Sequence, residues 1–320
     1  MKNKKIIFIT GVAGMLGSEL IKKLLSPKNI IIGIDNFKLG KKKFIKNYLE
    51  AKNFHFFNID LSKKIKNHRL DKTLKKYKPD EIWLLAANSD IQKGVLDANE
   101  DLNNTFLTTY NSLYFLEKFL KNKTKIIFAS SSAIYGDIKE KINEKTLPNF
   151  PESNYGSMKL ASEGFIASYS SKNKIKSFIF RFPNVVGINL THGILYDFKK
   201  KFSSKNKTVN VLGDGNQTKP YSFSSEILDC MVFVVLKAHK ALINHFNIGP
   251  NDSGIKVKEI VKLYKKYFPK KLIKYEKKNK GWEGDIPKYR YDTKKINKLG
   301  FIFKSNSKEA VFKAIYNLYK

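Results

Sequence analysis

The stretch KIIFITGVAGMLGSEL, Lys5 to Leu20, decides the fold of this chain. Residues 6–9 form a continuous apolar run of strand-forming residues, which is typical of a strand buried on both faces. The glycines Gly11, Gly14 and Gly17 follow, and apolar residues then recur at helical spacing. The order of strand, glycine loop and helix presents bare backbone N–H groups and a helix N-terminus where a pyrophosphate can bind.

The next apolar run, residues 30–34, ends in Asp35, about 20 residues beyond the glycines. A carboxylate at this place can bind both ribose hydroxyls of an adenosine. Its charge would repel a 2′-phosphate, and neither Asn36 nor Phe37 offers a compensating cation. Glycines spaced G-x-x-G-x-x-G also occur in ordinary loops, but together with Asp35 they predict a site for NAD rather than NADP.

Apolar runs and helical segments alternate through the first part of the chain and mix irregularly beyond Pro183. We expect strands at 53–60, 80–87, 124–136 and 176–182, and helices at 62–78, from about 91 to 121 and at 154–171. Further strands are expected at 208–212, 221–224, 245–248 and 272–275, with helices near 193–203, 225–238, 256–267 and 307–319. This predicts an α/β fold, a Rossmann-type doubly wound parallel sheet with a smaller α+β lobe. The expected division is 1–182 and 183–320, partly interleaved.

Lysine supplies most of the formal charge of +33. Such a balance can mark binding to nucleic acid or an anionic membrane. The lysines are scattered over every expected helix, so we expect neither nucleic acid nor a membrane as partner. No apolar run is long enough to span a bilayer, the N-terminal segment is too short for a signal peptide, and Cys230 lies in an apolar run. These features predict a cytoplasmic protein, and no metal site is expected.

Tyr155 and Lys159 form a Y-x-x-x-K pattern that shares one face of an expected helix. Tyrosine, with an ordinary pKa near 10, is a poor base at neutral pH, but a nearby ammonium stabilises its phenolate. The cluster Ser130–Ser132 ends the fifth strand and offers a hydroxyl to a reacting oxygen. A surface pair and a polar strand end are the alternatives; the glycine loop upstream favours a catalytic set.

The blocks GVAGMLG, LAA, SSSAIYG, YGSMK and RFPNVVG, with Asp35 and Asp60, resemble the extended short-chain dehydrogenase/reductase family. Its members are NAD-dependent nucleotide-sugar epimerases and dehydratases. The likeness spans nearly the whole chain, because GDGNQTKPYSF and GDIPKYRYD match later family blocks. It implies an enzyme with NAD as cofactor, a nucleotide-diphosphate sugar as substrate, bound by the lobe 183–320, and a homodimer.

The resemblance implies a role for each matching residue. Tyr155 would be the base, Lys159 its electrostatic partner and Ser131 the matching hydroxyl. The expected cofactor-binding residues are Gly11, Gly14, Met15, Leu16, Gly17, Asp35, Asn36, Asp60, Leu61, Leu85, Ala86, Ala87, Asn104, Tyr155, Lys159 and Phe182. The expected substrate-binding residues are Ser132, Asn184, Lys219 and Arg290. Lys219 stands where relatives often have arginine. A lysine supplies the positive charge but not the pair of parallel hydrogen bonds that an arginine guanidinium gives to a phosphate. His192 is a further candidate for the sugar pocket, with a structural role as the alternative.

The family oxidises the sugar at C4, and its members differ in the step after this oxidation. Dehydratases that resemble this chain carry carboxyl groups directly after the catalytic hydroxyl residue, where this chain has Ser132 and Ala133. We therefore expect oxidation without dehydration. NSDIQKG (88–94) and THGILYDF (191–198) resemble bacterial members that act on GDP-linked sugars, including GDP-manno-heptose C4 dehydrogenases of capsule biosynthesis.

The expected activity is therefore oxidation of a GDP-linked sugar or heptose to a 4-keto sugar, and a UDP- or GDP-sugar 4-epimerase is the alternative. A non-catalytic NAD-binding regulator and a nucleic-acid-binding scaffold are the alternatives from other classes. The homodimer is expected to form through helices near 104–120 and 154–170, whose apolar residues are Phe106, Leu113, Leu116, Leu160, Phe165 and Ile166.

Overall fold

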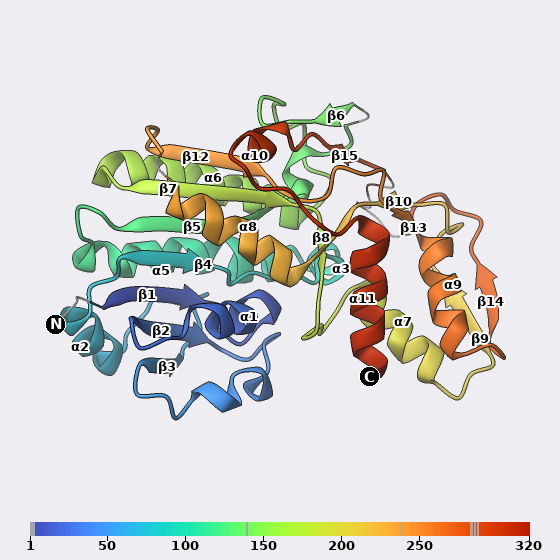
Figure 1. Ribbon diagram of the computed structural model, residues 1–320, viewed down its shortest axis with the longest axis horizontal. Coiled ribbons are helices and arrows are strands. Elements are labelled where there is room, and N and C mark those ends of the chain that lie inside the picture. The colour runs from blue at the N-terminus through green and yellow to red at the C-terminus, as the bar shows by residue number, and fades with distance from the viewer. Residues whose placement is uncertain (1–3, 139, 238, 282–283, 285, 287) are drawn as a thin grey trace.

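The computed structural model describes residues 4–138, 140–237, 239–281, 284, 286 and 288–320. Its centre is a seven-stranded parallel sheet in the order β12-β7-β5-β4-β1-β2-β3 (Figure 1). The strands are β1 (Lys5–Thr10), β2 (Asn29–Asp35), β3 (Phe54–Asn58), β4 (Glu81–Leu84), β5 (Lys125–Ser131), β7 (Lys176–Phe182) and β12 (Ile243–Asn247). The strand order reverses between β1 and β4, the place where ligands bind in such sheets. The expected Rossmann-type fold is confirmed.

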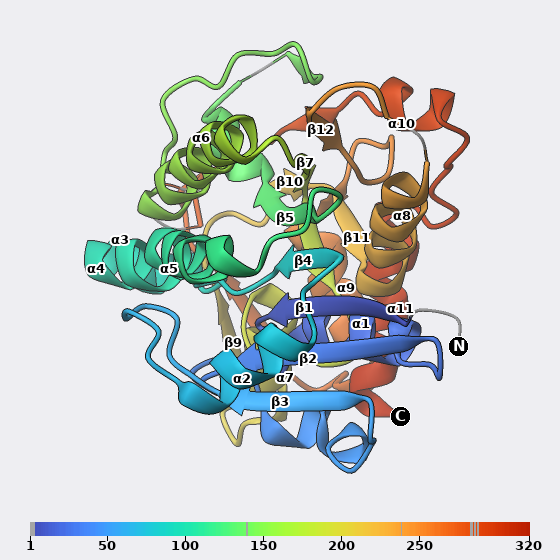
Figure 2. The same ribbon diagram turned by 90° about the vertical axis from the view of Figure 1, so that its left-hand side faces the viewer.

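Helices cover both faces of the sheet (Figure 2). One face carries α1 (Met15–Leu24) and α8 (Ser224–Leu236); the other carries α2 (His68–Lys76), α5 (Leu107–Leu116) and α6 (Asn154–Asn173). Alternate strand residues feed two separate cores: Ile7 and Ile9 pack with α1 and α8, and Ile6 and Phe8 pack on the opposite side. Burial on both faces explains why these strands read as continuous apolar runs.

A smaller lobe lies beyond one end of the sheet. It contains α7 (Ile194–Ser203), α9 (Val257–Tyr267), α11 (Ser307–Tyr319) and the parallel strand pair β9 (Thr208–Val211) and β14 (Leu272–Tyr275) around a core of its own. Two short pairs complete it: β8 (Asn184–Val186) with β11 (Tyr221–Phe223), and β10 (Thr218–Lys219) with β13 (Ile255–Lys256). A third short pair, β6 (Lys141–Ile142) with β15 (Arg290–Tyr291), lies near the β12 edge of the main sheet and has a small core of its own. The strand β12 comes from beyond residue 183 and joins the main sheet. The boundary at 182/183 stays a prediction.

Two expected helices are shorter than their periodicity suggested. The helix expected at 62–78 begins only at His68, because Asn67 is extended and its side chain accepts a hydrogen bond from the Leu70 N–H. The helix expected from about 91 to 121 is divided into α3 (Ile91–Leu96), α4 (Ala98–Asp101), a π-helical turn (Leu102–Phe106) and α5. Asp97, with φ −144°, interrupts it and caps α4 by accepting a hydrogen bond from the Asn99 N–H.

The prediction of the dimer surface is wrong for three of its six apolar residues. Leu113, Leu116 and Ile166 are fully buried in the core on one face of the sheet, so none of them can face a partner.

Across the part of the chain that the structure describes, no helix is both long and apolar enough to cross a membrane.

Candidate active site

A cavity of about 350 Å³ opens beyond the carboxyl ends of the strands and extends to the smaller lobe. It brings together nearly all the expected site residues: Gly11, Gly14, Met15, Leu16, Gly17, Asp35, Asn36, Leu61, Leu85, Ala86, Ala87, Asn104, Ser131, Ser132, Tyr155, Lys159, Phe182, Asn184 and Lys219. These come from segments up to about two hundred residues apart, which the parallel sheet aligns at one edge.

Two expected residues lie outside the described cavity wall. The Asp60 carboxylate is turned to its own loop, where Oδ1 accepts hydrogen bonds from the Ser62 N–H at 3.0 Å and from Asn36 Nδ2 at 3.4 Å. Arg290 is exposed on β15, and its neighbour Tyr289 lines the cavity instead.

The glycine loop is shaped as its spacing predicts. Gly11 has φ +68°, and a Cβ there would lie 2.8 Å from the Ala86 backbone nitrogen. A Cβ on Gly17 would lie 2.1 Å from the Gly11 carbonyl oxygen, so only glycine lets α1 approach β1 this closely. The N-cap Gly14 has no side-chain cap and the first turn has no acidic residue, so the backbone N–H groups are left for an anion.

Asp35 ends β2 in the cavity wall and is nearly buried. Its carboxylate accepts hydrogen bonds from the Ala13 N–H at 2.9 Å and the Phe37 N–H at 2.7 Å. Burial raises the pKa of Asp35, and these backbone donors oppose that shift. The backbone of Asn36 also donates to this carboxylate, and since a carboxylate has about four acceptor positions, capacity remains for a ribose hydroxyl.

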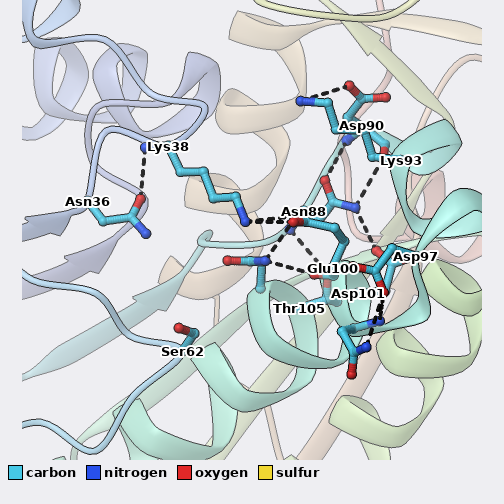
Figure 3. Close-up of polar contacts among 12 residues, drawn as sticks. Asn36, Lys38, Ser62, Asn88, Asp90, Lys93, Asp97, Glu100, Asp101 and Thr105 are labelled. Atoms are coloured by element: carbon cyan, nitrogen blue, oxygen red, sulfur yellow. Dashed lines mark hydrogen bonds and ion pairs between the residues drawn. The ribbon is translucent and has the colours of Figure 1, made fainter.

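An ion pair that no local sequence pattern marks spans the cavity wall. Lys38 Nζ, in the loop after β2, lies 2.9 and 2.8 Å from the two carboxylate oxygens of Glu100 on α4 (Figure 3). Asn104 donates to the same carboxylate at 3.2 Å, and all three residues line the cavity. We call Lys38 and Glu100 the clasp. Because the Lys38 ammonium is paired with Glu100, it does not offset the negative charge of Asp35. The prediction that Asp35 repels the 2′-phosphate of NADP therefore stands as it was made from the sequence.

The expected catalytic residues converge at the end of β5. Tyr155 lies in the first turn of α6, which Ser153 caps by accepting a hydrogen bond from the Gly156 N–H. The Tyr155 side chain is hydrogen-bonded to Ser131, and Lys159 lies one turn further along the helix. Lys159 Nζ donates to the Ala129 carbonyl at 2.6 Å and lies 5.7 Å from the centre of the Tyr155 ring.

Burial acts on both members of this pair. It raises the pKa of the Tyr155 hydroxyl, and it lowers the pKa of Lys159 to about 7 against the opposing charges of Glu163 and Asp101. Both shifts disfavour the charged forms, because a charge loses hydration on burial. The tyrosinate form therefore depends on positive charge beside it, from Lys159 and from an oxidised nicotinamide when one is bound.

A buried ionic network supports the catalytic helix from behind. Glu163, one turn beyond Lys159, accepts three hydrogen bonds from the Arg181 guanidinium at 2.6–3.2 Å and one from Ser130 Oγ at 2.5 Å. Arg181 also donates to the Tyr135 hydroxyl at 2.8 Å. This network joins α6 to β5 and β7, so it fixes the position of Tyr155 and Lys159 on α6 relative to the sheet.

The far end of the cavity combines polar groups from three segments. Ser89 and Lys93 come from the stretch after β4, and His192 comes from the loop before α7. Burial lowers the pKa of His192, so this imidazole is neutral at pH 7. Asn184 Nδ2 is buried without a hydrogen-bond partner among the described residues, which suits a donor to a ligand oxygen. The only carboxylates in the described wall are Asp35 and Glu100.

The residues present fit a dinucleotide. The glycine cradle and uncapped α1 offer N–H donors for a pyrophosphate, and Asp35 on β2 offers an acceptor for a ribose. Tyr155 and Lys159 lie beside β5, on the other side of β1 from Asp35 in the sheet. Sequence reasoning found these residues because each lies in a short local pattern. It missed Lys38 and Glu100, which no local pattern marks, and it singled out Ser89 and Lys93 only as part of the NSDIQKG segment.

The sequence matches the model of the NAD dependent epimerase/dehydratase family over residues 7–249. A Methanocaldococcus jannaschii protein provisionally named UDP-glucose 4-epimerase is 27% identical over 316 residues, 97% of each chain. Human dTDP-D-glucose 4,6-dehydratase is 25% identical over 328 residues, 97% of this chain and 89% of that protein. The fold is that of UDP-glucose 4-epimerase from Thermotoga maritima, solved with UDP-glucose, at a TM-score of 0.83 and 23% identity over 98% of both chains.

Proposed function

This chain belongs to the NAD-dependent epimerase/dehydratase family and is an enzyme of nucleotide-sugar chemistry that uses NAD, and from that premise we propose that it is a 4-epimerase. It would oxidise a nucleotide-diphosphate sugar at C4 without dehydration and return the hydride in the same site. The observation that carries this proposal is a Ser131–Tyr155–Lys159 group in a cavity whose described wall holds no carboxylate besides Asp35 and Glu100, with Ser132 and Ala133 directly after Ser131.

Each residue of the group has a distinct part in the oxidation. The Tyr155 oxygen takes the proton of the C4 hydroxyl, and the Ser131 hydroxyl hydrogen-bonds the same substrate oxygen. Lys159 stabilises the tyrosinate by its charge. NAD, when bound, supplies the hydride acceptor. Removal of the C6 hydroxyl would need an acid beside Ser131, and neither Ser132 nor Ala133, both in the cavity wall, can serve.

The clasp favours the epimerase outcome. An epimerisation leaves the cofactor in its starting redox state, so the enzyme gains nothing from exchanging it. An ion pair between Lys38 and Glu100, from elements 62 residues apart at the cavity wall, restrains the exit of a bound dinucleotide. The relatives named UDP-glucose 4-epimerase support the same outcome and a UDP-linked substrate.

The second candidate is a C4 dehydrogenase of a GDP-linked sugar or heptose. NSDIQKG (88–94) and THGILYDF (191–198) carry the resemblance to enzymes of that class, and residues of both segments line the same cavity end. Ser89, Lys93 and His192 would then contact the sugar.

Sugars deuterated at C4, linked to UDP or GDP, distinguish the two candidates. An epimerase returns the C4 epimer with deuterium kept at C4 and no net rise in the absorbance of reduced cofactor. A dehydrogenase forms a 4-keto sugar and reduced, deuterated cofactor in equal amounts. A 6-deoxy-4-keto product contradicts both, and absence of turnover with every sugar nucleotide favours a non-catalytic regulator.

We also infer a homodimer, formed through α5, α6 and the π-helical turn between α4 and α5. Stacked aromatic side chains support it: Phe106, Tyr110, Tyr114 and Phe165 form a continuous strip with ring centroids 5.2–6.4 Å apart. Tyr110 and Tyr114 are 38% and 57% exposed. The cytoplasmic location stays a prediction.

A further inference from the structure

A buried carboxyl group with no ion-pair partner among the described residues lies near the catalytic pair. Asp101, the last residue of α4, is fully buried and lies outside the cavity wall. Asn88 Nδ2 donates to its Oδ1 at 2.8 Å, as Figure 3 shows, and its Oδ2 has no hydrogen-bond partner among the described residues. Burying a carboxylate that accepts only one hydrogen bond destabilises the folded protein unless a nearby opposite charge stabilises it.

The room for this carboxyl comes from a glycine. A Cβ on Gly94 of α3 would lie 1.7 Å from Asp101 Oδ2, so any other residue there would displace Asp101. The Gly94 carbonyl accepts a hydrogen bond from Asn154 Nδ2 at 2.8 Å, at the start of the catalytic helix α6. Asp101 therefore packs against Gly94, and Gly94 in turn is hydrogen-bonded to the first turn of α6, which carries Tyr155.

The buried charges on this side of the sheet balance only when Asp101 is counted. Lys159 is 2% exposed, and its Nζ donates to a neutral carbonyl, that of Ala129. Glu163, whose charge acts most strongly on Lys159, is held by the Arg181 guanidinium. Two buried cations therefore share one paired carboxylate. The charge of Asp101 raises the pKa of Lys159, which favours the ammonium form; it also raises the pKa of Tyr155, so Asp101 can favour the tyrosinate only through Lys159.

We propose that Asp101 is a positioning residue, a buried counter-charge that keeps Lys159 in its ammonium form and so keeps Tyr155 able to accept a proton. This rests on the proposed roles of Tyr155 and Lys159. Gly94 and Asn88 serve it, the first by leaving space for the carboxyl and the second by orienting it with a hydrogen bond.

The proposal has a defined pH dependence. Burial raises the pKa of Asp101 to about 6; the hydrogen bond from Asn88 and the charge of Lys159 lower it, and the carboxylates of Glu100 and Asp90 raise it. Above about pH 6 Asp101 is charged and holds the proton on Lys159. Below that pH it is neutral, and the counter-charge is lost.

The direct test follows Lys159 by NMR in protein that carries ¹³Cε-labelled lysine, with its signal assigned by its loss in Lys159→Met. In Asp101→Asn we expect the titration midpoint of Lys159 to fall by about 1 unit or more, the effect of losing a nearby opposite charge. The unmodified protein should show a second inflection of the same signal near pH 6, which needs no variant at all. Asp97→Asn is the matched control, since Asp97 is exposed at the start of the same helix.

Kinetics separate this role from a purely structural one. The kcat/KM profile of Asp101→Asn should coincide with that of the unmodified enzyme below about pH 6, where Asp101 is neutral in both, and its basic limb should move to lower pH. An unchanged Lys159 midpoint, or a uniform loss of rate at every pH, overturns the proposal. A shifted Lys159 midpoint in a protein that turns over no sugar nucleotide would overturn the proposed function alone.

Discussion

At the scale of single residues, Tyr155 and Lys159 are placed together for catalysis, but burial keeps both from taking the charged forms that catalysis needs. Both side chains are nearly fully buried, which disfavours tyrosinate and ammonium alike. The pair becomes competent only through the charges around it, from Glu163, from Asp101 and from the bound cofactor. A reactive pair that depends on its ligand stays inert when the site is empty.

Tyr155→Phe should reduce turnover by about 100- to 10,000-fold and leave NAD affinity almost unchanged, because only the proton acceptor is lost. Steady-state kinetics and calorimetric titration with NAD measure the two effects. Tyr169→Phe is the matched control: it lies on the same helix, is buried, and donates to the Leu113 carbonyl at 3.0 Å, away from the cavity. Full activity in Tyr155→Phe would refute the assignment of the base.

Asp35→Ala should narrow the preference for NAD over NADP. The variant loses charge-assisted hydrogen bonds to the ribose, worth about 1.5–3 kcal/mol, and also the repulsion of a 2′-phosphate. Affinities for both cofactors, measured on the same preparation, cancel any loss of folded protein. Asp71→Ala on α2, outside the cavity wall, should leave the ratio unchanged. Equal affinities for NAD and NADP in the unmodified protein would contradict the role of Asp35.

At the scale of elements, the segment from α3 to α5 joins the cofactor side of the cavity to the catalytic helix. It supplies Glu100 to the clasp, Asn104 to the cavity wall and Asp101 to the buried charges. The π-helical turn at 102–106 follows directly and packs against α6. A displacement of this segment would therefore affect cofactor retention and catalysis together.

Glu100→Gln should release bound NAD about 2- to 5-fold faster. An exposed ion pair contributes about 0.2–1 kcal/mol, and the Lys38 and Glu100 side chains are 47% and 28% exposed. Stopped-flow displacement of NAD measures the rate, and about 1 M salt should remove the difference by screening. Glu117→Gln, which breaks the Lys172–Glu117 pair outside the cavity wall, is the control. An equal release rate in Glu100→Gln would show that the clasp does not restrain the cofactor.

The sequence was informative wherever a local pattern had a local cause. The four apolar residues before Gly11 predicted β1, and helical periodicity predicted α6 and α11 almost to their ends. The break at Asp97 was missed, because its cap competes with a helical pattern that continues on both sides. The clasp was missed for another reason: Lys38 and Glu100 are 62 residues apart, and no periodicity reports a contact between distant segments. Asp101 was missed because a polar residue in an expected helix normally lies on the exposed face, and the sequence does not show that this one is buried.

At the scale of the whole molecule, the cavity needs both lobes. The parallel pair β8–β11 sets Asn184 opposite Tyr221, and both residues line the cavity, as does Lys219 at the end of β10. Helix α11 packs against β11 and stands between the main sheet and the helices of the smaller lobe in Figure 1. The substrate side of the cavity is therefore held by residues from beyond Pro183.

The aromatic strip predicts the oligomeric state. The unmodified protein should sediment as a dimer at micromolar concentration, and the double variant Tyr110→Glu, Tyr114→Glu should sediment as a monomer, because it would bury two charges at the interface. Tyr316→Glu is the matched control, since Tyr316 is 49% exposed on α11 and outside the strip. A monomeric mass for the unmodified protein would count against the dimer.

The place of β12 in the sheet has a consequence for how the protein is made. The strand β7, KSFIFRF, pairs with β5 on one side and with β12 on the other, and β12 is encoded well downstream. At a synthesis rate of about 5–20 residues per second, the ribosome needs several seconds to pass from Phe182 to Asn247. Throughout that interval the nascent chain presents an open, apolar strand edge, which favours pairing with other chains. Fast translation of this stretch, or a chaperone that covers the edge, should raise the yield of soluble enzyme.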